Sequence, residues 1–211
     1  MEDKFNGLLQ LEYIIKQSSY KSLEKAVASL VIFTHPDTVA QTGTRNIFMT
    51  IRNMSERGKD CIHNGITATQ DDNKSPTDAF IWAHSMTNRD YKHVQFNHIW
   101  AKSDDVNSYT NLANICVLPA FLSKLSDSHA NIKCLLQYRA FCLYQWKPKS
   151  TITPEKPEGY DLLHWSDTMP VVENIETVYR NVMGTERTDR TIASARRLGW
   201  VFSDYKPDGS L

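Results

Sequence analysis

The stretch FNHIWAKSDDVNSYTNLANICVLPAFLSKLSDSH, residues 96–129, decides the fold. Aromatic and β-branched residues favour extended backbone, proline ends a strand, and polar runs mark loops. The pattern predicts, in order, a strand over Tyr91 to Ile99, a polar loop over Ala101 to Asn111, a shorter apolar strand over Leu112 to Leu118, and a helix beginning at Ala120. The local order is therefore strand, loop, strand, helix.

Helical spacing of apolar residues predicts helices on both sides of this stretch. Two helices are expected within Leu8 to Phe33, and one at Thr44 to Arg57, ended by Gly58. Another is expected to start with Ser75 as its N-cap and Pro76 in its first turn. Three more are expected at Ile132 to Trp146, Val171 to Met183 and Thr188 to Leu198. We therefore expect an α+β protein that is mainly helical around a central hairpin, with a small helical appendage at the C-terminus.

These elements suggest four regions along the 211 residues. The expected divisions are an N-terminal helical region over 1–88, a core with its following helix over 89–147, a linker over 148–169 and a C-terminal unit over 170–211. The linker rests on the three prolines and the glycine of KPKSTITPEKPEGY. The last two helices resemble a helix-turn-helix unit, and a helical hairpin packed on the main body explains them equally well.

Composition narrows the class of protein. Lysine plus arginine equals aspartate plus glutamate, 24 each, which disfavours broad non-specific binding to nucleic acid. No two of the four cysteines form a C-x-x-C pair, which disfavours a zinc knuckle, and Cys116 and Cys142 lie in apolar runs typical of core thiols. The start MEDKFNGLLQLEY lacks a signal-peptide core, and no apolar run is long enough to span a bilayer. We therefore expect a cytoplasmic protein that does not enter a membrane.

Several arginines have both a structural and a functional interpretation. Arg45, Arg52 and Arg57 fit a solvated helix face, with phosphate contact as the alternative. Arg139 falls on or beside an apolar stripe, so its charge needs a carboxylate, a carbonyl or a bound phosphate as partner.

Five features of the central stretch form a pattern over about residues 90–130: Asn97-His98-Ile99, the polar loop, Asn111-Leu112, Leu118-Pro119 and Lys124-Leu125-Ser126-Asp127. This pattern resembles the HNH endonucleases of the ββα-metal (His-Me finger) group. The resemblance implies a hairpin and helix that hold one hard cation, Mg²⁺ or Mn²⁺, beside a catalytic histidine.

The resemblance also implies roles for single residues. His98 would be the general base that activates water, because a histidine titrates near neutral pH. Asn97 would occupy the first metal-ligand position, with a neutral oxygen where the family often has an acid. Asn111 would fix the hairpin, with Asn114 as a rival for that role.

The family's last ligand, a histidine or asparagine on the helix, falls near Ser123 in this sequence. Asp127 and His129 follow closely, and either could replace it if the helix is shifted. The metal ligands therefore come from Asn97, Ser123, Asp127 and His129.

The implied activity is hydrolysis of phosphodiester bonds in DNA by a metal-dependent endonuclease, with RNA left open as a substrate. Family analogy associates such enzymes with restriction, phage defence or mobile elements. A homodimer or a partner protein is compatible with the sequence. Two alternatives remain: an inactive HNH-like module that binds nucleic acid or a partner, and a helical interaction protein in which the hairpin is purely structural.

Overall fold

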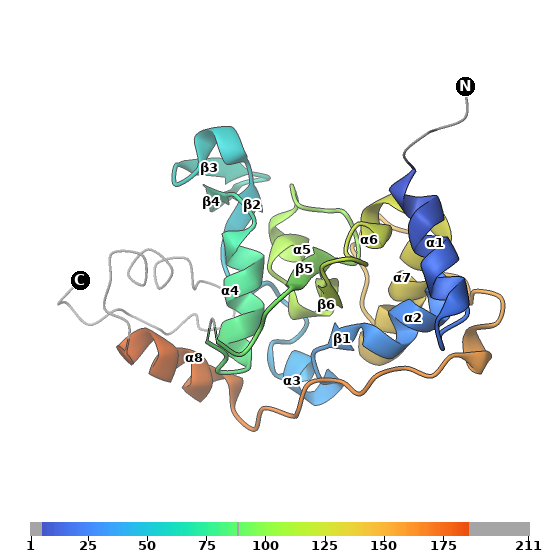
Figure 1. Cartoon of the computed structure of the whole chain (residues 1–211). Coiled ribbons are helices and arrows are strands. Elements are labelled where there is room, and N and C mark those ends of the chain that lie inside the picture. Colours follow the sequence, from blue (N-terminus) through green and yellow to red (C-terminus); the bar gives the residue numbers. More distant parts are fainter. Residues whose placement is uncertain (1–5, 88, 186–211) are drawn as a thin grey trace.

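The computed structural model describes residues 6–87 and 89–185 (Figure 1). It confirms an α+β protein. The predicted helix at 188–198, and with it the helix-turn-helix interpretation, lies outside the described residues. The described helices are α1 (Gly7–Gln17), α2 (Leu23–Leu30), α3 (Pro36–Gln41), α4 (Lys74–Ala83), α5 (Val106–Tyr109), α6 (Leu125–Ser128), α7 (Ala130–Tyr144) and α8 (Ile175–Thr185), with 3-10 turns η1 (Met54–Glu56), η2 (Leu112–Asn114) and η3 (Tyr160–Leu162).

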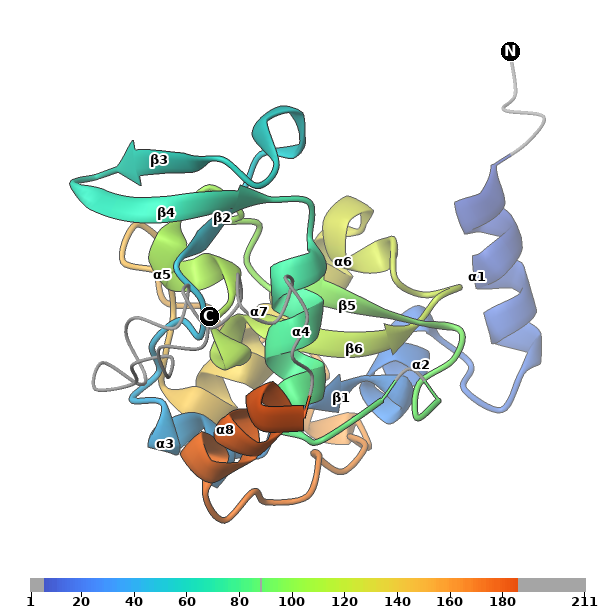
Figure 2. The same ribbon diagram turned by 90° about the vertical axis from the view of Figure 1, so that its left-hand side faces the viewer.

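The described strands form two sheets. The strands are β1 (Ile32–Phe33), β2 (Thr50–Arg52), β3 (Asp60–His63), β4 (Ile66–Asp71), β5 (Val94–His98) and β6 (Ile115–Pro119). One sheet has the order β1-β6-β5 and is antiparallel throughout. The other has the order β2-β4-β3 and lies apart from the first, at the N-terminal end of α4 (Figure 2).

The predicted strand pair is present, but both strands begin three residues later than predicted, and Leu112–Asn114 form η2 in place of strand. β5 and β6 pair antiparallel with His98 opposite Ile115 and Val94 opposite Pro119. The expected loop between them contains α5, where the Asp105 carboxylate accepts a hydrogen bond from the Asn107 backbone N–H and so caps the helix. The residues after Pro119 form a turn, and α6 begins only at Leu125.

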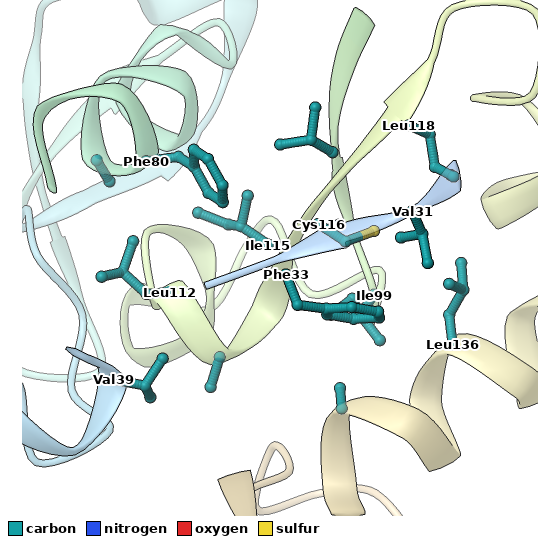
Figure 3. Packing of buried hydrophobic residues seen from close by; sticks show 14 of the residues in the cluster. Val31, Phe33, Val39, Phe80, Ile99, Leu112, Ile115, Cys116, Leu118 and Leu136 are labelled. Carbon is teal, nitrogen blue, oxygen red and sulfur yellow. The ribbon is translucent and has the colours of Figure 1, made fainter. Parts of the chain in front are cut away.

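The main core surrounds β6. Ile115, Cys116 and Leu118 are fully buried and pack with Phe33 from β1 and Leu136 from α7 (Figure 3). Each large apolar side chain buried in this way contributes roughly 1.5–3 kcal/mol. The same cluster includes residues from α2, α4 and α8. The N-terminal region, the central core and the C-terminal unit predicted from the sequence therefore share this one core. The expectation for the thiols was right for Cys116 and wrong for Cys142, which is exposed on the outer face of α7.

The segment 147–174, here called the strap, packs on this core. It runs along α2, β1 and α3, with backbone hydrogen bonds from Ser166 to Ala28 and from Met169 to Phe33 (Figure 1). Trp165 in the strap contacts the Phe33 ring, and the Arg139 guanidinium lies 4.9 Å from the Trp165 ring centre. Arg139 therefore has an aromatic face beside it, where the sequence led us to expect a carboxylate, carbonyl or phosphate.

The predicted helix over Thr44 to Arg57 is wrong. This segment contains no α-helix: the Ile47 N–H donates to the Thr110 carbonyl in a run of bends, Thr50 to Arg52 form β2, which pairs parallel with β4, and Met54 to Glu56 form η1. The partners come from about 20 and 60 residues further along the chain, so local spacing could not reveal them. The helix that was predicted to start with Ser75 as its N-cap is present as α4, but it starts at Lys74, so Ser75 lies inside it. The Asp71 carboxylate accepts a hydrogen bond from the Ser75 N–H and takes the capping role that was predicted for Ser75.

No described helix has the length and apolar character needed to cross a membrane.

Candidate functional site

His98 lies at the end of β5, where the chain leaves the sheet. Its Nε2 lies 2.8 Å from the Tyr109 carbonyl oxygen, and its ring stacks on the Tyr109 ring with centres 5.3 Å apart. A carbonyl can only accept a hydrogen bond, so Nε2 carries the proton and Nδ1 carries the free lone pair of the neutral ring. Within the described ranges Nδ1 has no hydrogen-bond partner. The ring is thus oriented by one nitrogen and left with a basic nitrogen on the other side.

The surroundings of His98 keep its ring neutral at pH 7. Burial is the main cause and lowers the pKa of His98, and the positive charge of Arg52 lowers it further. The Tyr109 carbonyl and the negative charge of Asp127 act in the opposite direction. A histidine with a lowered pKa is unprotonated near neutral pH and can therefore accept a proton.

Tyr109 is held at both of its ends. Its carbonyl accepts from His98, while its buried hydroxyl accepts a 2.8 Å hydrogen bond from the Asn73 N–H and lies 3.3 Å from the Asn73 side-chain oxygen. Burial raises the pKa of Tyr109, so the hydroxyl stays protonated. The orientation of His98 thus depends on the corner between β4 and α4. Sequence reasoning did not assign this role to Tyr109, because no local pattern reports which carbonyl a distant histidine meets.

Asn114 closes the loop between β5 and β6. It is fully buried; its Oδ1 accepts from the Trp100 N–H at 2.8 Å, and its Nδ2 donates to the carbonyls of Trp100 at 3.2 Å and Ser108 at 2.9 Å. These bonds fix the chain directly after His98 to the start of β6 and to α5. The Asn114 side chain thus adds three hydrogen bonds to the backbone pairing at these two strand ends.

Asn111 ties the hairpin to a different part of the chain. Its Nδ2 donates to the Thr44 carbonyl at 2.6 Å, and its Oδ1 accepts from the Ala113 N–H at 2.9 Å. Asn111 therefore secures the extended segment before β2 and begins η2. Both predicted asparagines are structural groups of this site, with separate partners.

Asn97 points toward the turn before α6. Its Nδ2 donates to the Ser123 carbonyl at 2.9 Å and to the Ser126 hydroxyl at 2.8 Å. Its Oδ1 is a buried oxygen that has no hydrogen-bond partner in the described part of the chain. The structure thus brings together Asn97, Ser123 and Ser126. Ser126 belongs to the stretch Lys124-Leu125-Ser126-Asp127, but no pattern in the sequence assigns it a contact.

The remaining candidate ligands differ in their surroundings. Asp127 is exposed on α6, and its charge reaches His98. The Ser123 hydroxyl donates to the Ala120 carbonyl at 2.9 Å. The His129 Nδ1 accepts from the Ile132 N–H at the start of α7, and the residue lines a cavity of about 260 Å³ with Glu12 of α1. His129 therefore has a capping role and faces α1 and α2.

Two of the candidate ligands offer oxygen atoms to a cation. Mg²⁺ prefers oxygen ligands, and the unpartnered Oδ1 of Asn97 and the carboxylate of Asp127 are both oxygens. An amide and one carboxylate are a weak set, because Mg²⁺ sites in proteins usually rely on carboxylates, waters and substrate phosphates. In the described ranges no three His, Cys, Asp or Glu side chains gather where they could hold a metal. Any cation here would therefore depend on water and on substrate oxygens for its other ligands.

A scan against protein-family models, a search of the curated proteins and a search of the solved structures each gave no match to this chain. What the site does is therefore inferred from its side chains and their geometry.

Proposed function

We propose that the protein is a metal-dependent endonuclease that hydrolyses phosphodiester bonds in DNA, with His98 as the general base. The observation that supports this most strongly is the state of the His98 ring: Nε2 is committed to the Tyr109 carbonyl, and Nδ1 is a free base on a ring that is neutral at pH 7. Hydrolysis of a phosphodiester requires such a base to take a proton from the attacking water.

The proton has a defined path. Nδ1 of His98 accepts it from the water as the oxygen attacks phosphorus, and the imidazolium that forms is stabilised by the Tyr109 carbonyl and by the negative charge of Asp127. The hydrogen bonds of Asn114 keep His98 at the end of β5 while this happens. The bond from phosphorus to the leaving oxygen breaks, that oxygen takes a proton from solvent water, and the His98 ring returns the proton it accepted to solvent.

Asn97 and Asp127 are the residues that would hold the cation. When bound, Mg²⁺ or Mn²⁺ stabilises the negative charge on the phosphate and on the leaving oxygen. We favour Asp127 over His129 as the second ligand, because His129 caps α7. Ser123 contributes through its carbonyl, which holds the Asn97 amide in place.

The test is nicking of supercoiled plasmid by the purified full chain with Mg²⁺, Mn²⁺ or EDTA. We expect cutting with either metal, none in EDTA, and loss of at least about 100-fold in rate for His98→Ala. His63→Ala is the matched control, since His63 lies on β3 in the other sheet and should keep the wild-type rate. Cutting that His98→Ala leaves intact would exclude His98 as the base.

A second candidate function is an HNH-like module that binds nucleic acid without cutting it. It is favoured by the Asn97 amide, whose two hydrogen bonds to the α6 region give it a structural role. This function predicts DNA binding that is equal in Mg²⁺ and EDTA, and no cutting with any metal. In that case His98→Ala would change stability and leave binding unaltered.

A further inference from the structure

Arg52 lies next to the His98 site although it comes from the other sheet. It is the last residue of β2, and its backbone N–H donates to the Ser103 carbonyl at 2.8 Å, in the loop that follows β5. β2 also packs against α5, the short helix that ends at Tyr109. The sequence places these residues more than 40 positions apart, so the fold alone makes Arg52 a neighbour of His98.

The guanidinium of Arg52 is exposed and forms no ion pair with any residue in 6–87 or 89–185. Its side-chain contact is a 3.8 Å approach to the Met54 sulfur. Arg57, five residues after β2 ends, is instead paired with Asp72 at 2.8 Å. Arg52 therefore keeps a positive charge that the described protein does not neutralise.

This charge acts on two groups of the site, the His98 ring and the Tyr109 hydroxyl. The negative charge of Asp127 acts on His98 from α6. An unpaired positive charge from β2 and a negative charge from α6 therefore both act on His98.

We infer that Arg52 binds the phosphate that is cleaved and holds it against Nδ1 of His98, an assignment that rests on the proposed nuclease function. The guanidinium is the side chain best suited to this, because its planar fork can donate two parallel hydrogen bonds to phosphate oxygens. This assignment would also explain how a protein with a net charge of zero can act on DNA, which is a polyanion. A single cation at the reacting phosphate would take the place of a broad basic surface.

The experiment compares Arg52→Gln and Arg52→Lys with Arg57→Gln, a matched control on a nearby exposed arginine that already has a carboxylate partner. Plasmid cutting gives kcat and KM, and binding of a duplex oligonucleotide in EDTA gives Kd over a range of salt concentrations. We expect Arg52→Gln to lower kcat/KM by about 10- to 100-fold and to reduce the slope of log Kd against log salt by about 0.9. Arg52→Lys should recover part of the loss, and Arg57→Gln should match wild type.

The outcomes separate this inference from the function on which it rests. If wild type cuts, His98→Ala does not, and Arg52→Gln keeps both the wild-type kcat/KM and the wild-type salt slope, then Arg52 does not bind the phosphate and the nuclease function stands. If wild type neither cuts nor binds DNA, both fail. Because the Arg52 side chain is exposed, the melting temperature of Arg52→Gln should equal that of wild type, and a large decrease would mean that Arg52 is structural.

Discussion

Replacing Asn114 by alanine should separate the end of β5 from the start of β6. The change removes three side-chain hydrogen bonds, to the N–H and the carbonyl of Trp100 and to the Ser108 carbonyl. Trp100 and Ser108 are themselves buried, so these backbone groups would lose their partners out of reach of water. At about 1 kcal/mol per bond, the free energy of unfolding should fall by about 3 kcal/mol.

Urea unfolding of the full chain measures this loss, and a thermal scan should show a melting temperature lower by about 6–12 °C. Asn107→Ala is the matched control, because Asn107 is an exposed asparagine of the same loop and should change stability by less than about 0.5 kcal/mol. Hydrogen exchange at the Trp100 amide should accelerate in Asn114→Ala and not in Asn107→Ala. A loss below about 1 kcal/mol, with Trp100 still protected, would refute the role of Asn114 in closing the loop.

Three further predictions concern the body of the protein. Burial lowers the pKa of His84 to about 4, so the folded protein binds fewer protons than the unfolded chain below pH 6.5. The free energy of unfolding should therefore be at its full value above pH 6.5 and fall by up to about 3 kcal/mol toward pH 4. The same dependence of unfolding free energy on pH in His84→Gln would contradict this. Trp165→Ala removes the aromatic face beside Arg139 and should expose the strap to limited proteolysis, whereas cleavage at the wild-type rate would show that the strap is held by other contacts. Asp71→Ala removes the cap on the Ser75 N–H and should destabilise the protein by about 1–2 kcal/mol in urea unfolding, and no loss would mean that α4 needs no cap there.

The sequence predicted those elements whose pattern is local. α7 was expected over Ile132 to Trp146 and is present over Ala130–Tyr144, because its apolar residues recur at helical spacing over four turns. β5 and β6 were expected from their β-branched and aromatic residues, and their antiparallel pairing is confirmed. α2 lies within the predicted range of Leu8 to Phe33, and α1 begins one residue before that range, at Gly7.

The errors arose where long-range partners determine the backbone. The segment over Thr44 to Arg57 has helical spacing of apolar residues, yet the backbone N–H groups of Ile47 and Phe48 donate to Thr110 and so are not available to a helix. Capping at α4 was assigned to the nearest serine, whereas the cap comes from Asp71 at the end of a strand that was not predicted. Tertiary contacts outweighed local preference in both places.

At the candidate site, too, local patterns were predictable and long-range contacts were not. The motif spacing led us to select His98 and both asparagines as candidates. It could not tell which asparagine spans the hairpin, because that depends on the backbone groups that each side chain contacts. Tyr109 and Ser126 could not be assigned roles, since their partners lie on other elements. The position of Arg52 beside the candidate site depends on the packing of β2 against α5, which local sequence patterns do not predict.

The most direct test of His98 as the general base is chemical rescue of the His98→Ala variant. The purified variant is incubated with supercoiled plasmid and Mg²⁺, and imidazole is added over a range of concentrations at a pH above the pKa of free imidazole. If Nδ1 of His98 takes the proton from water, cutting should return in proportion to the imidazole concentration and remain sensitive to EDTA. Cutting by wild type with no rescue of a correctly folded variant at any imidazole concentration would contradict the assignment of the base.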